Sequence, residues 1–154
     1  MKAPKKRRVA ELMNPDVVCV RPEASVAEAA RLLAERGVTG APVVDEAGGL
    51  LGVISQTDLV RHSTRHVTAG ESGRFFTDMD EFQDLAAVPA NLSDTPVSQV
   101  MRKQVYTVHR DASAAVAANI MRERKVHRLL VTERGRLVGV VGALDLLRVV
   151  EESC

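Results

Sequence analysis

The five residues Val9-Ala10-Glu11-Leu12-Met13 return in altered form as Val97-Ser98-Gln99-Val100-Met101, and this repetition decides the fold. The correspondence continues at an almost constant offset along the chain. Two further pairs of matching stretches belong to it: Glu35-Arg36 with Glu123-Arg124, and Asp58-Leu59 with Asp145-Leu146. Neither short copy can bury its apolar face alone, so we expect the two to pack about a pseudo-two-fold axis. Ligands favour the cleft between such halves, and function is expected there.

Composition restricts the class of protein. The chain has 154 residues, a formal net charge of +1 and 3% aromatic residues. We therefore expect an aliphatic core, few platforms for stacking nucleic-acid bases, and no overall attraction to anionic membranes. The two cysteines and the histidine spacings fit neither a disulfide framework nor a zinc site. No signal peptide and no apolar run of membrane-spanning length are present, which predicts a soluble cytoplasmic protein.

The first copy, 9–62, is predicted to run strand, helix, strand, strand, helix after a short opening helix. Ser25 and Glu28 form a capping-box pattern at the start of the first long helix, and Gly37 follows its end. Thr57 is expected to cap the closing helix. The predicted elements are the opening helix at 9–13, strand 17–20, helix 25–36, strands 41–44 and 50–55, and the closing helix to 62.

The second copy, 95–150, repeats this order. Val116 stands where the first copy has Glu28, so the capping box is expected to be lost. The predicted elements are a helix with Pro96 at its first position, strand 105–108, helix 113–124, strands 126–132 and 137–141, and helix 143–150. The fold class is therefore α+β, with two pseudo-symmetric β-α-β-β-α repeats, each a small sheet packed with two helices.

Three segments lie outside the copies: a basic tail at 1–8, expected to be disordered; a linker at 63–94 with a short acidic helix; and a C-terminal tail at 151–154. The basic tail could bind phosphate, although a solvated end is the simpler interpretation. The linker holds all three phenylalanines, Phe75, Phe76 and Phe82. We expect them to pin the linker to the core; a surface for a partner is the alternative.

The strongest chemical signal is the stretch Gly52-Val53-Ile54-Ser55-Gln56-Thr57-Asp58. It leads from a buried strand into a helix start, where unpaired amides and partial positive charge suit an anion. Ser55 and Thr57 add hydroxyl donors, and the Asp58 carboxylate can accept from the neighbouring hydroxyls of a ribose. One short stretch thus suits both a phosphate and a sugar. A plain helix cap is the alternative.

Together with Gly37-Val38-Thr39-Gly40-Ala41-Pro42-Val43-Val44-Asp45, this stretch and the duplicated order resemble the tandem cystathionine-β-synthase-type (CBS) domain pair, or Bateman module. The resemblance covers 9–62 and 95–150, and the combination is specific although each motif alone is weak. It implies clefts that bind AMP, ADP, ATP or S-adenosylmethionine, without an obligatory cofactor. In the family, a hydroxyl-x-Thr/Ser-Asp motif of one repeat holds phosphate and ribose, and the other repeat lines the adenine.

Carried over to this chain, the resemblance implies that Ser55, Thr57 and Asp58 form the polar half of one ligand site. Val126-His127-Arg128 of the second copy would lie opposite, with Tyr106 near the base. Arg128 would bind phosphate, and His127 could add charge as the pH falls. The alternative for His127 and Arg128 is an exposed strand end.

The pseudo-symmetric second site departs from the pattern. Gly142 and Leu144 replace the two hydroxyl residues, Asp145 remains, and the facing residues Val38, Thr39 and Gly40 carry no charge. Each lost donor or cation is worth about 0.5–3 kcal/mol. The sequence therefore predicts one nucleotide site, with the second site empty or occupied by an uncharged adenosine-like ligand.

No arrangement of residues predicts catalysis or a metal site. His62 and His66 have helical spacing in a stretch where a helix is doubtful, and Cys19 is expected to be a small buried hydrophobe. We expect a stand-alone, non-enzymatic regulatory module that signals to an effector protein. The resemblance also implies a homodimer, with Leu32/Leu33 and Ile120/Met121 as compatible apolar faces. The alternatives are a ligand-independent dimeric scaffold, or a nucleic-acid binder that uses the basic tail.

Overall fold

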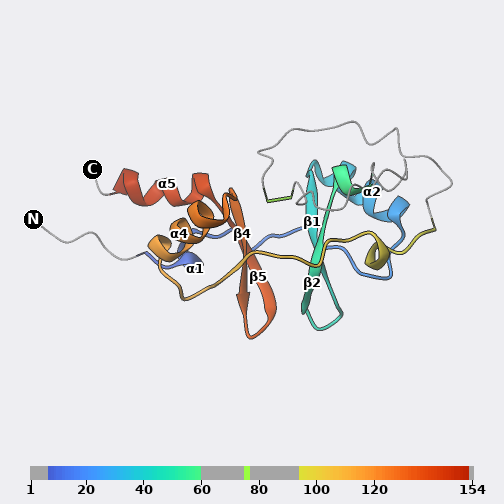
Figure 1. Ribbon diagram of the computed structural model, residues 1–154, viewed down its shortest axis with the longest axis horizontal. Coiled ribbons are helices and arrows are strands. Elements are labelled where there is room, and N and C mark those ends of the chain that lie inside the picture. Colours follow the sequence, from blue (N-terminus) through green and yellow to red (C-terminus); the bar gives the residue numbers. More distant parts are fainter. Residues whose placement is uncertain (1–6, 60–74, 77–93, 153–154) are drawn as a thin grey trace, which may run out of the picture. The chain divides into compact units, whose positions relative to one another are not determined.

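The computed structural model describes residues 7–59, 75–76 and 94–152 and divides the chain into two compact units. One unit, Val18–Val105, is here named the Asp58 unit. The other combines Met1–Val17 with Tyr106–Cys154 and is named the Asp145 unit. Figure 1 shows the elements of both, which are helices and small sheets as the predicted α+β class requires.

The described part of the Asp58 unit contains a β-hairpin and a helix. Its elements are α2 (Val26–Arg36), β1 (Gly40–Val44), β2 (Leu50–Ser55) and the 3-10 helix η3 (Val97–Gln99). Strands β1 and β2 are antiparallel. The strand predicted at 17–20 is wrong in extent, because only Val20 forms a bridge, parallel to Val43. The amide of Val17 is instead used in a turn, where it donates to the Pro15 carbonyl at 3.1 Å.

Helix α2 begins and ends where the sequence predicts. The Ser25 hydroxyl accepts a hydrogen bond from the amide of Glu28 at 3.1 Å, and Gly37 ends the helix with φ 63°. One face of α2 is buried in the core of the unit together with residues of both hairpin strands and of η3. The fully buried members of this core include Val26, Leu33, Ala41, Val43, Ile54, Leu59 and Val97.

Phe75 and Phe76 support the predicted pinning of the linker. Both side chains are buried, and their rings meet edge to face with centroids 4.9 Å apart. Phe75 also closes over Gly40, where an added Cβ would lie 2.8 Å from its ring. Phe82, the acidic segment, His62 and His66 lie outside the described residues.

The Asp145 unit is built on a three-stranded sheet of order β3-β4-β5. Strand β4 is parallel to β3 and antiparallel to β5. The elements are α1 (Val9–Leu12), β3 (Thr107–His109), α4 (Ala114–Arg124), β4 (Arg128–Glu133), β5 (Arg136–Gly142) and α5 (Ala143–Glu152). The order matches the prediction, although β3 and β4 begin two residues later than expected. The Ser113 hydroxyl still caps α4 by accepting from Val116 N, and Lys125 takes the left-handed position of Gly37 with φ 57°.

The opening segment of each copy belongs to the unit that the other copy builds. Asn14 in the first copy exchanges backbone hydrogen bonds of 2.8 and 3.0 Å with Val140 of β5. Arg102 in the second copy does the same with Val53 of β2, at 2.8 and 2.9 Å. Pro96 precedes η3 and is not its first residue. Each compact unit therefore contains residues from both sequence repeats.

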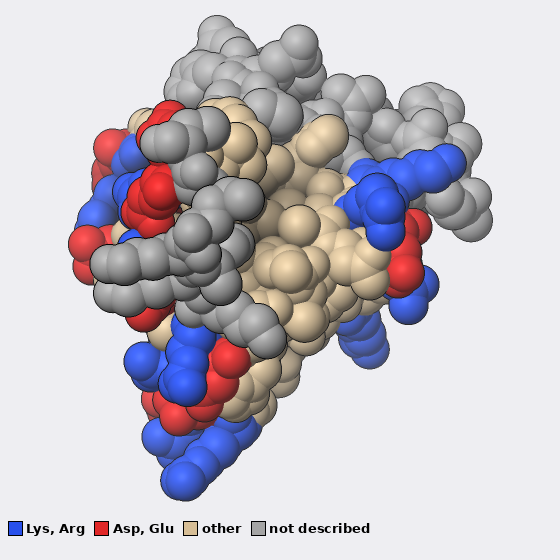
Figure 2. Space-filling view, turned by 90° about the vertical axis from the view of Figure 1, so that its left-hand side faces the viewer, with Lys and Arg blue, Asp and Glu red and all other residues tan. Residues whose placement is uncertain are grey.

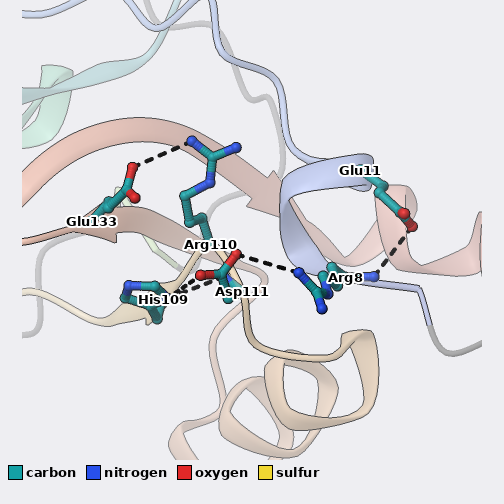
Figure 3. A network of polar contacts seen from close by, with 6 residues as sticks. All are labelled: Arg8, Glu11, His109, Arg110, Asp111 and Glu133. Atoms are coloured by element: carbon teal, nitrogen blue, oxygen red, sulfur yellow. Dashed lines mark hydrogen bonds and ion pairs between the residues drawn. The ribbon is translucent and has the colours of Figure 1, made fainter.

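The end of the basic tail is fixed, so the predicted disorder is wrong for Arg7 and Arg8. Arg7 pairs with Glu11 at 3.0 Å and with Glu152 of α5 at 2.9 Å. Figure 3 shows Arg8 beside Asp111, with an N–O distance of 3.8 Å, in a group of polar side chains. The same group includes a 3.3 Å ion pair between Arg110 and Glu133. The ion pairs of Arg7 and Arg8 hold the start of α1 against the rest of the Asp145 unit.

Candidate functional site

The turn from β2 into the following helix brings together the predicted polar residues of the Asp58 unit. The helix begins at Gln56, directly after β2, so Ser55 is its N-cap. The Ser55 hydroxyl accepts from the amide of Asp58 at 3.1 Å, and the Asp58 carboxylate accepts from the amide of Ser55 at 3.1 Å. This is a reciprocal capping box. The prediction that Thr57 caps the helix is wrong, because Thr57 lies inside its first turn.

The carboxylate of Asp58 also pairs with a cation. Arg102 donates through Nε to Oδ1 of Asp58 at 2.9 Å, while Oδ2 accepts from the Ser55 amide. The side chain of Asp58 is 5% exposed and that of Arg102 is 26% exposed. Because the Arg102 backbone is bonded to Val53 on β2, the guanidinium is presented from a fixed point. A charge-assisted hydrogen bond in so buried a place fixes the orientation of the carboxylate.

Residues of the predicted weaker site lie next to this same turn. The amide of Gln56 donates to the carbonyl of Thr39 at 2.8 Å, and Gly40 is the register partner of Ser55. The segment 38–40 therefore borders the Asp58 turn within one unit. Asp145, which the sequence grouped with 38–40, belongs to the other unit.

The Asp145 unit has an equivalent turn without the hydroxyls. The carboxylate of Asp145 accepts from the amide of Gly142 at 2.8 Å, at the start of α5. The amide of Ala143 donates to the carbonyl of His127 at 2.8 Å, and Arg128 is the register partner of Gly142. The backbone pattern thus repeats that of the Asp58 turn, while the side chains differ.

The predicted site residues therefore fall into two groups. Ser55, Thr57 and Asp58 lie in the Asp58 unit. The other group, in the Asp145 unit, comprises Tyr106, half-buried; Val126, buried; His127, exposed; and Arg128, half-buried. Within this group, His127 and Arg128 border the Asp145 turn. The joint role of the two groups at one ligand stays a prediction.

Sequence reasoning missed Arg102. The available signal was its place in the repeat: it follows Val97–Met101 at the position where the first copy has Asn14. The Asn14 side chain turns back on its own chain and accepts from the amide of Asp16 at 3.0 Å. The contrast between an arginine and a short amide was visible in the sequence. The contact with Asp58, which lies on a distant segment, was not.

Within the part of the chain that the structure describes, Cys19 gives no sign of activation. Cys19 is half-buried, and burial raises the pKa of its thiol, which is the opposite of what a nucleophilic cysteine needs. Among the described residues, no group of three or more His, Cys, Asp or Glu side chains could hold a metal ion. In the same part of the chain, no helix combines the length and apolar character needed to cross a membrane.

The comparisons with known proteins agree on one family. The CBS domain model matches the chain twice, over 9–65 and 97–152. The chain is 29% identical to CBS domain-containing protein CBSX2, chloroplastic, of Arabidopsis thaliana, over 91% of this chain and 62% of that protein. It is 28% identical to the uncharacterized protein MJ1232 of Methanocaldococcus jannaschii, over 93% of this chain and 39% of that one. The chain thus spans less than two-thirds of these curated relatives.

Solved structures agree with this result. The crystal structure of CBSX2 in complex with AMP matches with a TM-score of 0.68 and 26% identity, covering 95% of this chain and 97% of the other. The CBS domain of a CBS domain-containing membrane protein from Sphaerobacter thermophilus matches with a TM-score of 0.70 and 25% identity, covering 95% and 89%. The predicted fold class and the predicted family resemblance are confirmed.

Proposed function

This chain belongs to the CBS-domain family, and we propose that it is a regulatory module that binds an adenine nucleotide at the Asp58 turn. The observation that carries the proposal is the buried Asp58 carboxylate, oriented by the Ser55 amide and by Arg102. The AMP complex of a relative that matches nearly the whole chain supports the choice of ligand class.

The chemistry of the turn suits the sugar of a nucleotide. Each oxygen of an ionised carboxylate can accept more than one hydrogen bond, so the contacts of Asp58 with Ser55 and Arg102 leave acceptor capacity for ribose hydroxyls. The hydroxyl of Ser55 accepts from the Asp58 amide and can still donate its own proton. Thr57 adds a second hydroxyl on the same turn.

We propose that the two turns bind ligand unequally. Gly142 and Leu144 provide no side-chain donor where the Asp58 turn has Ser55 and Thr57. The sequence also predicts that the Asp145 site lacks a facing cation. That prediction gives no reason for unequal binding, because Arg128 borders the Asp145 turn. The hydroxyl difference alone predicts one tight AMP site per chain. Titration calorimetry that finds two equal sites would contradict it.

A thermal melting screen with AMP, ADP, ATP and S-adenosylmethionine tests the function. A ligand at 100 times its dissociation constant stabilises by about 2.7 kcal/mol, which corresponds to roughly 5–10 °C for a chain of this size. The substitution Asp58→Asn keeps the shape of the side chain and removes its charge, so the ligand-induced shift should be lost. Asp145→Asn should leave most of the shift in place. If none of these adenine compounds stabilises the wild-type chain, the proposal is wrong.

Regulation, rather than catalysis, is the role that we infer from the site. Binding at Asp58 and Arg102 would act on the segment 102–105, which leads out of the Asp58 unit where the chain enters the other unit at Tyr106. A partner could read the resulting change in conformation. The effector protein and the cytoplasmic location stay predictions.

A ligand-independent dimeric scaffold is the second candidate function, and one observation favours it. Helix α5 exposes three apolar side chains on one face, Leu144, Leu147 and Val150. Figure 2 shows an uncharged area of the surface bordered by groups of charged side chains. The faces expected from the sequence are less available, because Leu33 and Met121 are buried within their own units. Leu147→Glu should lower the mass measured by light scattering if α5 joins two copies.

The structure weakens the case for nucleic-acid binding by the basic N-terminal tail. Arg7 and Arg8 have carboxylate partners, so the free charge of the tail would have to come from the lysines at positions 2, 5 and 6, outside the described residues. Removing residues 1–6 should leave the melting shift with AMP unchanged.

A further inference from the structure

We infer that Arg102 binds the phosphate of the nucleotide and so makes the Asp58 turn select nucleotides over nucleosides. This inference rests on the proposed function and concerns the same turn. It assigns the phosphate contact within the Asp58 unit to a residue of the second copy's opening segment, where the sequence had pointed to Arg128.

The geometry places a cation directly beside the carboxylate that is proposed to bind the sugar. Arg102 reaches the Asp58 carboxylate through Nε at 2.9 Å, and among the described residues this is the hydrogen bond that its guanidinium makes. The terminal amino groups of the fork lie beyond Nε and can donate to an oxyanion in a bidentate manner. The side chain keeps 26% of its surface exposed, although its backbone is bound to β2.

Asp58 and Arg102 can serve one ligand together. The carboxylate is an acceptor for the sugar, and the guanidinium is a donor for the phosphate. An ion pair between them in the free protein holds both groups in place, so that less ordering is needed when the ligand arrives. Adenosine has no phosphate for Arg102 to contact, so it benefits from this cation only through the orientation of Asp58.

The second copy of the turn supplies an internal comparison. Asn14 stands in the position of Arg102, bonded to β5 through the same pair of backbone hydrogen bonds. Its short side chain is engaged with the amide of Asp16 and brings no charge to Asp145. The opening segment therefore brings a cation to the Asp58 turn and none to the Asp145 turn, where the neighbouring cation, Arg128, lies on β4 instead.

The experiment measures the affinities of AMP and adenosine by titration calorimetry in the full chain and compares their ratio. In the wild type, AMP should bind more tightly than adenosine. Arg102→Gln should weaken AMP by about tenfold or more beyond any weakening of adenosine, since the hydrogen bond to the phosphate is lost for AMP only. The matched control is Lys103→Gln, which removes the same charge from the neighbouring exposed residue and should preserve the ratio.

The ratio remains informative even if Arg102→Gln lowers stability, because adenosine binding reports on the integrity of the turn. Should that variant fail to fold, Arg102→Lys keeps the charge but not the fork, and should reduce the preference for AMP less than the Gln variant is expected to. Equal weakening of AMP and adenosine would overturn the inference and leave Arg102 as a support for Asp58. An equal effect of Lys103→Gln on the ratio would also overturn it. Failure of the wild type to bind either ligand would instead reject the proposed function.

Discussion

Two glycines allow a second backbone to approach the middle of a strand. A Cβ at Gly52 would lie 2.5 Å from the carbonyl oxygen of Arg102, and a Cβ at Gly139 would lie 2.6 Å from the sulfur of Met13. Both glycines have ordinary backbone angles, so the requirement is for space and not for a special conformation. Each glycine leaves the space in which the opening segment of the other copy packs.

Substitution of Gly52 by Ala should therefore destabilise the chain by about 1–3 kcal/mol, because the obstacle is a backbone atom that cannot rotate away. Gly142→Ser provides the contrast. A Cβ there would meet its nearest neighbours at 3.5 and 3.7 Å, and the hydroxyl could cap α5 as Ser55 caps its helix. Urea unfolding should show a lower midpoint for Gly52→Ala and an unchanged or higher midpoint for Gly142→Ser. An unchanged midpoint for Gly52→Ala would contradict the close approach of Arg102 to Gly52.

Two equivalent helices end differently. The C-cap of α2 is Gly37 and the C-cap of α4 is Lys125, and both residues have left-handed backbone angles, φ 63° and φ 57°. Glycine adopts this conformation without steric cost, whereas a residue with a Cβ is strained by about 1 kcal/mol. The second copy therefore carries strain that the first avoids.

Exchanging these end residues should change stability in opposite directions. Lys125→Gly should stabilise the chain by about 0.5–1 kcal/mol, and Gly37→Lys should destabilise it by a similar amount. The measurement is the urea midpoint of each single variant against the wild type. The space around Gly37 is open, so a loss there would come from the backbone and not from a clash. Destabilisation by Lys125→Gly would show that the Lys side chain has an unrecognised role.

Because the opening segments are exchanged, each compact unit needs residues from both copies in order to fold. Val97 of the second copy is fully buried in the core of the Asp58 unit, among residues of the first copy. Arg102 closes the edge of β2 and pairs with Asp58. Neither sequence repeat contains all the parts of a compact unit.

A fragment that ends at residue 93 should therefore fail to fold, as measured by circular dichroism and by resistance to protease. Adding a peptide of residues 94–105 in excess should restore structure, because it supplies Val97 and Arg102. A peptide with Val97→Asp is the control and should not restore it, since a buried carboxylate would be left without a partner. A fragment that folds alone with the stability of the full chain would contradict the exchange.

AMP binding should stabilise the contact between the second copy's opening segment and the Asp58 unit. The Arg102→Gln variant loses one of the contacts that hold the second copy's opening segment on the Asp58 unit. Amide exchange at Arg102, which donates to the Val53 carbonyl at 2.8 Å, should slow when AMP binds to the wild type. The amide of Asn14, bonded to Val140 in the other unit, is the internal reference and should change less.

From the sequence alone, the duplication, the order of the elements in the second copy, the caps of α2 and the aliphatic core could be predicted. These features depend on local periodicity and on residues a few positions apart, such as Ser25 with Glu28. The sequence also singled out Ser55 and Asp58, although it assigned the cap to Thr57, because both Ser55 and Thr57 offer a hydroxyl near the junction of strand and helix. A reciprocal bond between Ser55 and Asp58 shows where the helix starts.

Only the tertiary structure decided which copy completes which unit and which cation meets Asp58. The match of Val9–Met13 with Val97–Met101 is equally compatible with segments that stay in their own copy and segments that are exchanged. The sequence pointed to Arg128 and not to Arg102, although both are arginines of the second copy. The choice depends on contacts between residues distant in the chain, and such contacts leave no periodic signal in a single sequence.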